Sequence, residues 1–401
     1  MNDGRVLVAG VGGGGGRALA HLHEHWRETP ELAVLHTNEA LLSANPIARR
    51  LAIGGSATDG LSTGGDPEIG RRAAEEAADA LRELWNGVEL AVVVAGLGGG
   101  TGGGAAPVVS RIARESGALT LAVCTMPFFF EGVGRRRRAE ESLRALRVAA
   151  DAVIVFPNQR LFEWVGEGAP LARAFAVVDE VVAAGLRSLW RLMTQRWMLE
   201  VDFADLRRLA LGGERQLGLA AFEAGGPNRV PETLAHLRES PLLERGQTLV
   251  AARGLIVAAV AGPDLTLSEF DRLIHGVTEQ VHPNAELHIG AAIDPEYEGR
   301  VGVTLLMSEQ APASEAEAPA TSESATAAAD TPEDSGARGA PAGAAAKPRR
   351  ARGAAKPVQG TLAIEPAGKG RFKDTAPTIL DGEDLDVPTF LRRGLKLSST
   401  P

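Results

Sequence analysis

Two glycine-rich runs near the start of the chain have the composition of phosphate-binding loops. They read GVGGGGGR at residues 10–17 and LGGGTGGGAAP at residues 97–107. Glycine lets the backbone turn tightly and lets phosphate oxygens approach main-chain N–H groups without interference from a Cβ atom. Every lysine lies at Lys347 or later, so a phosphate bound in this region must rely on N–H groups, arginine or a metal ion. Thr101 adds a hydroxyl group to the second run.

The first run also satisfies the dinucleotide-binding pattern G-x-G-x-x-G through Gly10, Gly12 and Gly15, so a Rossmann oxidoreductase is a remote alternative. A dinucleotide site usually has Asp or Glu at the end of the next strand, whereas residues 36–38 read HTN. A dinucleotide fold also has no need of a second polyglycine loop. Two such loops at the carboxyl ends of strands can surround a polyphosphate from two sides, and they favour a nucleoside polyphosphate as the ligand.

The residues around both loops alternate between short apolar runs and helical patterns, which predicts an α/β domain with a doubly wound parallel sheet. The predicted strands are Arg5–Ala9, Leu32–His36, Leu90–Ala95, Leu119–Cys124 and Ala152–Phe156. The predicted helices are Gly15–Trp26, Pro67–Trp85, Ala105–Ser116 and Arg136–Ala149. Each glycine run then leads from a strand into a helix, whose N-terminus adds N–H donors and the positive end of its dipole.

Apolar residues spaced three and four apart predict a long helix from Pro170 to Trp197, about 42 Å in length at the usual helical rise. Such a length is typical of a helix packed between two domains. Beyond it, the pattern predicts a smaller α+β domain. Its expected helices are Phe203–Leu211, Arg229–Arg238 and Leu267–Val281, and its expected strands are Leu255–Ala261, Ala285–Ala292 and Val301–Met307.

The composition limits the class of protein. The chain has 401 residues, 44% of them hydrophobic, and a net charge of −9. This length suggests two or three domains, and the negative charge gives no reason to expect nucleic-acid binding. No apolar run of about 18 residues occurs, so we expect a cytoplasmic protein without direct membrane insertion. The single cysteine, Cys124, excludes a disulfide within the chain and a multi-cysteine metal site, and no protein residues are assigned as metal ligands.

The composition changes sharply near Ser308. Residues 308–383 are rich in Ala, Pro, Ser, Thr and Glu, which predicts a disordered linker. Residues 384–401 form a short C-terminal tail that contains LDVPTFLRR. An apolar cluster at the end of a linker usually docks on a partner. The candidate partner-binding residues are Val387, Phe390, Leu391 and Arg392.

In their order along the chain, these motifs resemble those of the FtsZ/tubulin family of polymerising GTPases, and the chain is identified as a divergent bacterial member of its FtsZ branch. GGGTGGG at 98–104 is similar to the tubulin-type signature GGGTG[ST]G, and residues 10–18 resemble the first phosphate loop. PEIGRRAAEE, PFFFEG, FPNQRL and VDFADLR continue the match. The resemblance implies a tubulin-like fold, with a GTP-binding domain at 1–169, a central helix at 170–199 and a C-terminal domain at 200–307.

The same resemblance implies that the chain binds GTP together with Mg²⁺. The implied GTP-binding residues are Gly13, Gly14, Gly15, Gly16, Arg17, Gly100, Thr101, Gly102, Glu131, Arg135, Asn158, Asp179 and Glu180. Asp179 and Glu180 match the pair of residues with which the family reads the base. A carboxylate there can accept hydrogen bonds from the N1–H and the exocyclic amine of guanine, which adenine cannot match.

Residues 200–205 resemble the loop that members of the family insert into the nucleotide site of the next subunit. Asp202 and Asp205 are three residues apart, so both carboxylates lie on one face where a helix begins. The resemblance implies that they are catalytic and position water for hydrolysis, although Asp is also a favoured N-cap residue. A site shared between two subunits implies self-assembly into a head-to-tail polymer whose turnover is coupled to hydrolysis.

In function, the resemblance implies a cell-division GTPase that acts at the division site at midcell. The tail would bind division proteins and membrane-linked adaptors. Glu200, Arg17 and Asp179 depart from the family, which has asparagine at each of these positions. These departures motivate a second hypothesis, in which the chain binds GTP, hydrolyses it weakly or not at all, and modulates another filament.

Overall fold

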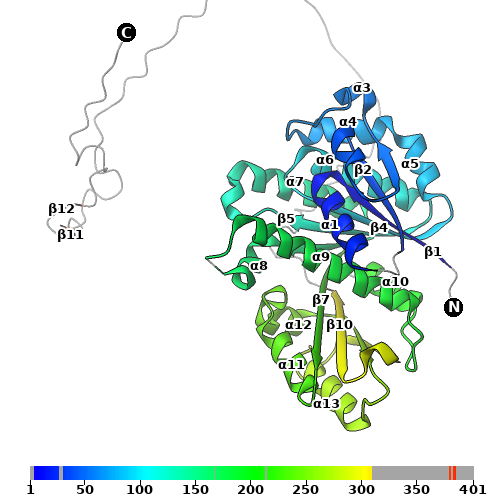
Figure 1. Ribbon diagram of the computed structural model, residues 1–401, viewed down its shortest axis with the longest axis vertical. Helices are drawn as coiled ribbons and strands as arrows, with labels where there is room; N and C mark the ends of the chain where they lie inside the picture. Colours follow the sequence, from blue (N-terminus) through cyan, green and yellow to red (C-terminus); the bar gives the residue numbers. More distant parts are fainter. Residues whose placement is uncertain are drawn as a thin grey trace, which may run out of the picture. The chain divides into compact units, whose positions relative to one another are not determined.

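The structure is a computed structural model that describes residues 4–26, 30–166, 168–212 and 215–308, together with the backbone of two short strands further along the chain (Figure 1). The residues described up to Ser308 belong to one compact unit. The two short strands, β11 (Ile379–Leu380) and β12 (Glu383–Asp384), pair antiparallel in a second unit. The rest of the predicted linker and tail lies outside the described residues. This part includes the partner-binding candidates Val387, Phe390, Leu391 and Arg392.

One ten-stranded sheet runs through the first unit in the order β3-β2-β1-β4-β5-β6-β7-β10-β8-β9. Neighbouring strands from β3 to β7 pair in parallel, whereas β10 is antiparallel to both β7 and β8. The strands are β1 (Arg5–Val11), β2 (Glu31–His36), β3 (Arg49–Ala52), β4 (Val88–Gly96), β5 (Leu119–Met126), β6 (Ala152–Pro157), β7 (Gln216–Gly225), β8 (Gly254–Ala261), β9 (Glu286–Ile293) and β10 (Arg300–Ser308).

Helices cover both faces of the parallel strands, which confirms the predicted doubly wound sheet (Figure 1). Successive side chains of a strand point to opposite faces. Val8 of β1 therefore joins the core beneath α1 and α9, whereas Leu7 and Ala9 join the core beneath α4, α5, α6 and α7. These helices are α1 (Gly12–His25), α4 (Pro67–Glu76), α5 (Ala78–Trp85), α6 (Gly100–Glu115), α7 (Val133–Ala149) and α9 (Leu171–Thr194).

The long helix α9 packs against both halves of the sheet. It has 24 residues, or about 36 Å at the usual rise. Its buried residues share one core with Val8 of β1, Leu219 of β7 and Leu306 of β10. The predicted long helix is thus confirmed, but it ends at Thr194 rather than at Trp197. The chain then becomes extended, and the main-chain N–H of Leu199 donates to the Ala291 carbonyl at 3.1 Å.

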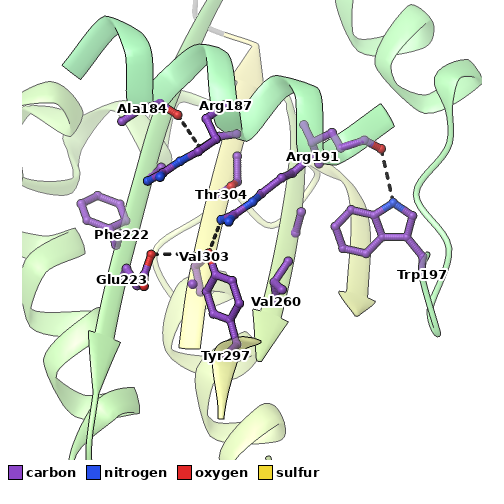
Figure 2. Close-up of a pocket in the computed structure, with 15 residues that line it drawn as sticks. Ala184, Arg187, Arg191, Trp197, Phe222, Glu223, Val260, Tyr297, Val303 and Thr304 are labelled. Carbon is purple, nitrogen blue, oxygen red and sulfur yellow. Dashed lines mark hydrogen bonds between the residues drawn. The ribbon is translucent and has the colours of Figure 1, made fainter. Parts of the chain in front are cut away.

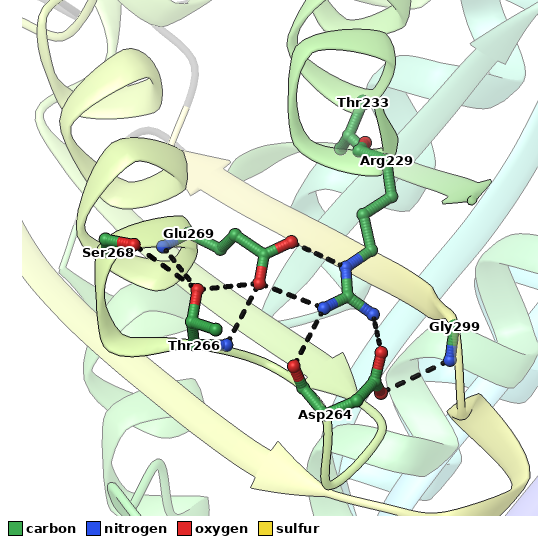
Figure 3. A network of polar contacts seen from close by, with 7 residues as sticks. All are labelled: Arg229, Thr233, Asp264, Thr266, Ser268, Glu269 and Gly299. Carbon is green, nitrogen blue, oxygen red and sulfur yellow. Dashed lines mark hydrogen bonds and ion pairs between the residues drawn. The ribbon is translucent and has the colours of Figure 1, made fainter. Parts of the chain in front are cut away.

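The C-terminal strands have a further core on their other face, beneath α11 (Arg229–Glu239), α12 (Gln247–Ala251) and α13 (Leu267–Thr278). Arg229 is buried where α11 begins and pairs with Asp264 at 2.6 Å and with Glu269 at 2.9 Å (Figure 3). The hydrogen bond from Arg229 and those from Thr266 lower the pKa of Glu269 to about 2. This network ties the start of α11 to the first turn of α13.

Several elements differ from those expected from the sequence. The single helix predicted at Pro67–Trp85 is wrong, because α4 ends at Glu76 and α5 begins at Ala78. Strand β7 and strand β3 were not predicted, nor was α8 (Asn158–Val165). β7 reads QLGLAAFEAG, in which small residues weaken the alternation, and pairing with β6 and β10 stabilises it as a strand. No helix among the described residues is long and apolar enough to cross a membrane.

Candidate functional site

The two glycine-rich runs meet at the carboxyl ends of neighbouring strands. The first follows β1 and opens α1, and the second follows β4 and opens α6. Their backbones are so close that a Cβ atom on Gly12 would lie 2.8 Å from the main-chain nitrogen of Gly102. A Cβ atom on Gly14 would lie 3.0 Å from Cα of Gly96. Glycine is therefore required by the contact between the loops, and the expected pairing of the two loops is confirmed.

The loops create a positive electrostatic environment without any lysine. The N-termini of α1 and α6 both point into this region, and neither helix has an acidic residue in its first turn. Free main-chain N–H groups and the positive ends of two helix dipoles suit an anion such as a phosphate group. Between the loops, the hydroxyl oxygens of Thr37 and Thr101 lie 3.0 Å apart, and both residues are buried.

A cleft of about 290 Å³, open to solvent at its mouth, lies over the loops. The sequence-predicted residues that line it are Gly13, Gly14, Arg17, Gly100, Thr101, Gly102, Glu131, Arg135, Asn158 and Asp179. Gly15, Gly16 and Glu180 do not line it. Gly15 packs against β4, where an added Cβ would lie 2.2 Å from the Val94 carbonyl oxygen. Glu180 forms an ion pair with Arg173 along α9.

Polar groups gather where α9 borders the cleft. Nε of Arg17 lies 3.4 Å from Oδ2 of Asp179. Burial raises the pKa of Asp179, and the nearby Arg17 offsets part of that shift. Asn158 is buried, and its Oδ1 atom has no hydrogen-bond partner among the described residues. A buried acceptor without a partner costs free energy, so this end of the cleft suits a ligand that carries N–H or O–H donors.

Glu131 and Arg135 form another polar edge of the cleft. Their side chains lie 3.1 Å apart, with Glu131 largely buried and Arg135 half exposed. Oε1 of Glu131 accepts the main-chain N–H of Phe128 at 2.8 Å, which fixes the carboxylate. Arg135 keeps guanidinium donors that face solvent. A fixed acceptor beside a mobile cationic donor can bind a sugar hydroxyl and a phosphate or carbonyl oxygen, respectively.

Phe175 and His36 are among the residues that line the cleft and that sequence reasoning missed. Phe175 belongs to the apolar stripe of α9, but it lies beside Asp179 and presents an aromatic ring to the cleft. His36 ends β2, and its Nδ1 accepts the Asn38 main-chain N–H at 2.8 Å. Burial lowers the pKa of His36, so the neutral ring carries its proton on Nε2. That nitrogen faces Gly13, whose added Cβ would lie 4.0 Å from it. The position of His36 at the carboxyl end of a strand was the available signal.

The acidic pair Asp202 and Asp205 does not line this cleft. Both residues lie beyond the C-terminal end of α9, where they begin α10 (Phe203–Leu211). Asp202 is exposed, and the side chain of Asp205 is 18% exposed. They form a reciprocal cap, since Oδ1 of Asp202 accepts the Asp205 N–H at 2.9 Å and Oδ2 of Asp205 accepts the Asp202 N–H at 3.1 Å. The capping alternative for Asp202 is thus confirmed.

The length of α9 separates the two groups. Asp179 lies in the N-terminal half of α9, and Thr194 ends the helix, so about 22 Å of helix lies between them. Within one subunit, the acidic pair and the cleft therefore lie at different ends of α9. Glu200 is exposed beside the pair. No group of three His, Cys, Asp or Glu side chains suited to a metal ion occurs among the residues that the structure describes.

A different cleft lies between α9 and the C-terminal strands (Figure 2). Arg191 of α9 donates to the hydroxyl group of Tyr297, and its Cζ lies 5.0 Å from the centroid of that ring. The Tyr297 hydroxyl lies 3.4 Å from Oε2 of Glu223 on β7. Burial raises the pKa of Tyr297. These contacts couple the last turns of α9 to the C-terminal part of the sheet.

Comparisons with known proteins agree with this geometry. The description "Tubulin/FtsZ family, GTPase domain" matches residues 5–166, and "FtsZ family, C-terminal domain" matches residues 217–310. The chain is 39% identical over 303 residues to cell division protein FtsZ 1 of Archaeoglobus fulgidus, which covers 75% of this chain and 81% of that protein. It is 37% identical over 302 residues to cell division protein FtsZ of Rhizobium radiobacter, covering 75% of this chain and 52% of that protein.

Solved structures give the same result. The chain matches an empty FtsZ dimer from M. jannaschii with a TM-score of 0.70 and 34% sequence identity. The match covers 76% of this chain and 88% of that one.

Proposed function

The chain belongs to the FtsZ family of tubulin-like cell-division GTPases, and from this premise we propose that it assembles head to tail into filaments and hydrolyses GTP between adjacent subunits. The observation that carries the proposal is the separation of the phosphate loops from Asp202 and Asp205. The two halves of the site lie at different ends of α9, and both are accessible to solvent. A second copy of the chain can bring its acidic pair to the first copy's cleft.

The cleft suits GTP at each of its parts. The glycine loops and the N-termini of α1 and α6 would bind the phosphates. The Asp179 carboxylate and Oδ1 of Asn158 are acceptors for the N–H donors of guanine, and Phe175 offers a ring on which a base can stack. Mg²⁺ would arrive with the nucleotide as part of the substrate. Arg17 beside Asp179 adds a donor for a guanine carbonyl or ring nitrogen.

The positions of the cleft and the acidic pair on each subunit account for filament assembly as well as for GTP hydrolysis. A contact between the cleft of one subunit and the α10 end of the next joins two different surfaces, and such a contact generates an open filament. The M. jannaschii structure is that of an FtsZ dimer, which supports self-association as a property of the family. Bound GTP would bridge the contact, and loss of the terminal phosphate would weaken it.

In hydrolysis, Asp202 and Asp205 would orient a water molecule toward the terminal phosphate of the neighbouring subunit's GTP. A carboxylate that accepts a proton from water as the phosphoryl group transfers contributes roughly 10²–10⁴-fold to the rate. Their reciprocal cap keeps both carboxylates at the start of α10. Glu200 adds a negative charge beside them, which opposes the approach of a polyphosphate and is expected to slow turnover.

Two further parts of the proposal concern the cell. By family membership, the filament would act at the division site at midcell. Val387, Phe390, Leu391 and Arg392 would bind division proteins and membrane-linked adaptors, and this assignment stays a prediction from the sequence. The alternative, a GTP-binding homologue that barely hydrolyses and modulates another filament, is motivated by Glu200, Arg17 and Asp179.

Nucleotide turnover as a function of protein concentration tests the proposal. With GTP and Mg²⁺, phosphate release per subunit should rise steeply once polymer appears in sedimentation, whereas ATP should support little turnover. Asp205→Asn should still bind GTP but lose about 100-fold in turnover. A rate per subunit that stays flat with concentration, or Asp205→Asn turnover equal to wild type, would contradict hydrolysis between subunits and favour the non-hydrolysing alternative.

A further inference from the structure

Asp205 is held by a residue from a strand far away in the sequence. Its Oδ2 atom serves the cap of α10, whereas its Oδ1 atom lies 3.0 Å from Nδ1 of His288 on β9. The side chain of His288 is 16% exposed, so this contact is largely shielded from solvent. Both oxygens of Asp205 are therefore engaged, one by its own helix and the other by the C-terminal end of the sheet.

His288 also contacts a second carboxylate. Its Nε2 atom lies 3.2 Å from Oε1 of Glu286, which is two residues earlier on β9. Arg208 of α10 lies 3.3 Å from the same Glu286 oxygen and 3.8 Å from Oδ1 of Asp205. Acidic and basic side chains thus alternate around a closed ring, which we call the β9–α10 ring: Asp205, His288, Glu286 and Arg208.

The chemistry of the imidazole makes this placement specific. Each ring nitrogen of His288 faces a carboxylate oxygen, and an ionised carboxylate only accepts hydrogen bonds. The imidazole can donate to both neighbours only when both nitrogens carry a proton. His288 thus lies between two acceptors, Asp205 on one side and Glu286 on the other.

The contact from His288 restricts the orientation of the Asp205 carboxylate. The cap fixes one carboxylate oxygen, and the bond from His288 fixes the other. Arg208 contributes less, because its side chain is 55% exposed and lies 3.8 Å from Asp205. The same strand also holds the segment before the acidic pair, since Leu199 forms an isolated bridge with Ala291 of β9. β9 therefore supports the catalytic segment at both ends.

We propose that His288 is a positioning residue for hydrolysis, which orients Asp205 toward the nucleotide of the neighbouring subunit. This inference rests on the proposed function, because Asp205 acts only when a second subunit supplies the nucleotide. A displacement of a reacting group by about 1 Å can cost two orders of magnitude in rate. His288→Leu, which leaves the cap of α10 in place, should lower kcat per polymerised subunit by roughly 10-fold.

Three variants separate positioning from a structural role. His288→Leu removes both ring nitrogens. His288→Asn keeps a donor nitrogen near the place of Nδ1, so it should recover turnover to within about threefold of wild type. Glu286→Gln is the matched control, because it removes the other carboxylate and leaves the contact between His288 and Asp205. For all three, the affinity for GTP should stay within about twofold of wild type, since the cleft lies elsewhere.

Wild-type turnover from His288→Leu polymer would overturn the inference. Equal loss of turnover in His288→Asn and His288→Leu would also overturn it. So would a GTP affinity of His288→Leu that falls together with its kcat. If the wild-type protein itself hydrolyses no GTP at any concentration, the proposed function fails first and the inference fails with it. Failure of the proposed function is distinguishable from failure of the inference about His288, because the former is measured on the wild-type protein alone.

A nucleotide-free measurement tests the contact itself. In protein labelled with ¹⁵N in the histidine rings, the His288 signal is identified by its loss in His288→Leu. The Asp205→Asn substitution should shift this signal, because the acceptor at Nδ1 loses its charge. An unshifted signal would overturn the contact between His288 and Asp205, whether or not the protein turns over GTP.

Discussion

In the nucleotide-free protein, burial of the Asp179 carboxylate at the edge of the cleft lowers the free energy of unfolding. The side chain of Asp179 is 16% exposed, and its nearest cation is Arg17 at 3.4 Å. Burial raises the pKa of Asp179 above its ordinary value of 3.8. The unfolded chain therefore loses this proton at a lower pH than the folded chain does. Stability falls as the pH rises through the interval between the two values, and the full cost is present at neutral pH.

Asp179→Asn should therefore stabilise the nucleotide-free protein at neutral pH. We expect its melting temperature to rise by a few degrees, and the difference from wild type to shrink as the pH falls below 3.8, where the wild-type carboxyl group becomes protonated in the unfolded chain as well. Thermal melts across this pH range measure the effect. The matched control is the neighbouring Glu180→Gln, which should change little because its ion pair with Arg173 lies at the surface, where such pairs contribute little to stability. A lower melting temperature for Asp179→Asn would show that the pair with Arg17 outweighs burial.

At the scale of elements, the second phosphate loop is shaped by the contact of α6 with α4. A Cβ atom on Gly104 would lie 1.8 Å from the Pro67 carbonyl oxygen, and one on Gly70 would lie 2.2 Å from the Gly100 carbonyl oxygen. The two helix backbones therefore touch directly, which only glycine allows. Gly99 differs, because it has an extended backbone with φ of −89° and an added Cβ would meet nothing within 4 Å.

This difference predicts a large loss of stability from an alanine at one of these two glycines and almost none from an alanine at the other. Gly104→Ala should destabilise the protein by about 3 kcal/mol, because α4 and α6 must separate to admit the methyl group. Gly99→Ala should change stability by less than about 0.5 kcal/mol. Chemical denaturation of both variants gives the comparison. Equal stabilities would mean that α4 and α6 can separate without cost, and the loop would then not depend on their contact.

At the scale of the whole molecule, α9 connects the cleft to the segment that carries the acidic pair. Asp179 lies in its N-terminal half and contributes to the cleft, whereas the segment after Thr194 leads to the acidic pair. Arg191, near the end of α9, contacts Tyr297 beside the C-terminal strands (Figure 2). The helix thus fixes the distance between the cleft and the acidic pair within one subunit.

A mixture of two inactive variants should therefore regain activity. Gly99→Asp places a carboxylate among the phosphates without a steric clash, while Asp still suits the N-cap position of α6. Asp205→Asn keeps its cleft and loses the catalytic carboxylate. Only about a quarter of randomly formed contacts in an equal mixture pair the intact cleft with the intact acidic pair, so the mixture should reach at most about a quarter of the wild-type rate.

Phosphate release from the mixture is compared with the sum of the two variants measured alone. The control is a mixture of Gly99→Ala with Asp205→Asn. It shows how much phosphate is released when the Asp205→Asn subunits are mixed with subunits whose cleft is intact. If the mixture of Gly99→Asp and Asp205→Asn releases no more phosphate than the sum, the two halves of the site act within one subunit. That result would contradict the head-to-tail arrangement.

The sequence by itself determined the parts of the molecule that depend on local chemistry. Two polyglycine runs, each between an apolar run and a helical pattern, indicated paired phosphate loops on a parallel sheet, because only glycine combines tight turns with close approach to N–H groups. The spacing of apolar residues also indicated the long helix. These features are set by residue types a few positions apart, and the structure contains them.

Only the tertiary structure decided which residues face one another across the fold. It placed Phe175 and His36 beside the cleft, turned Glu180 toward Arg173, and made a strand of Gln216–Gly225 by pairing it with β6 and β10. It also brought His288 to Asp205. The physical reason is that such contacts depend on strand order and on the direction in which each side chain leaves its element. Neither is encoded in the spacing of nearby residues.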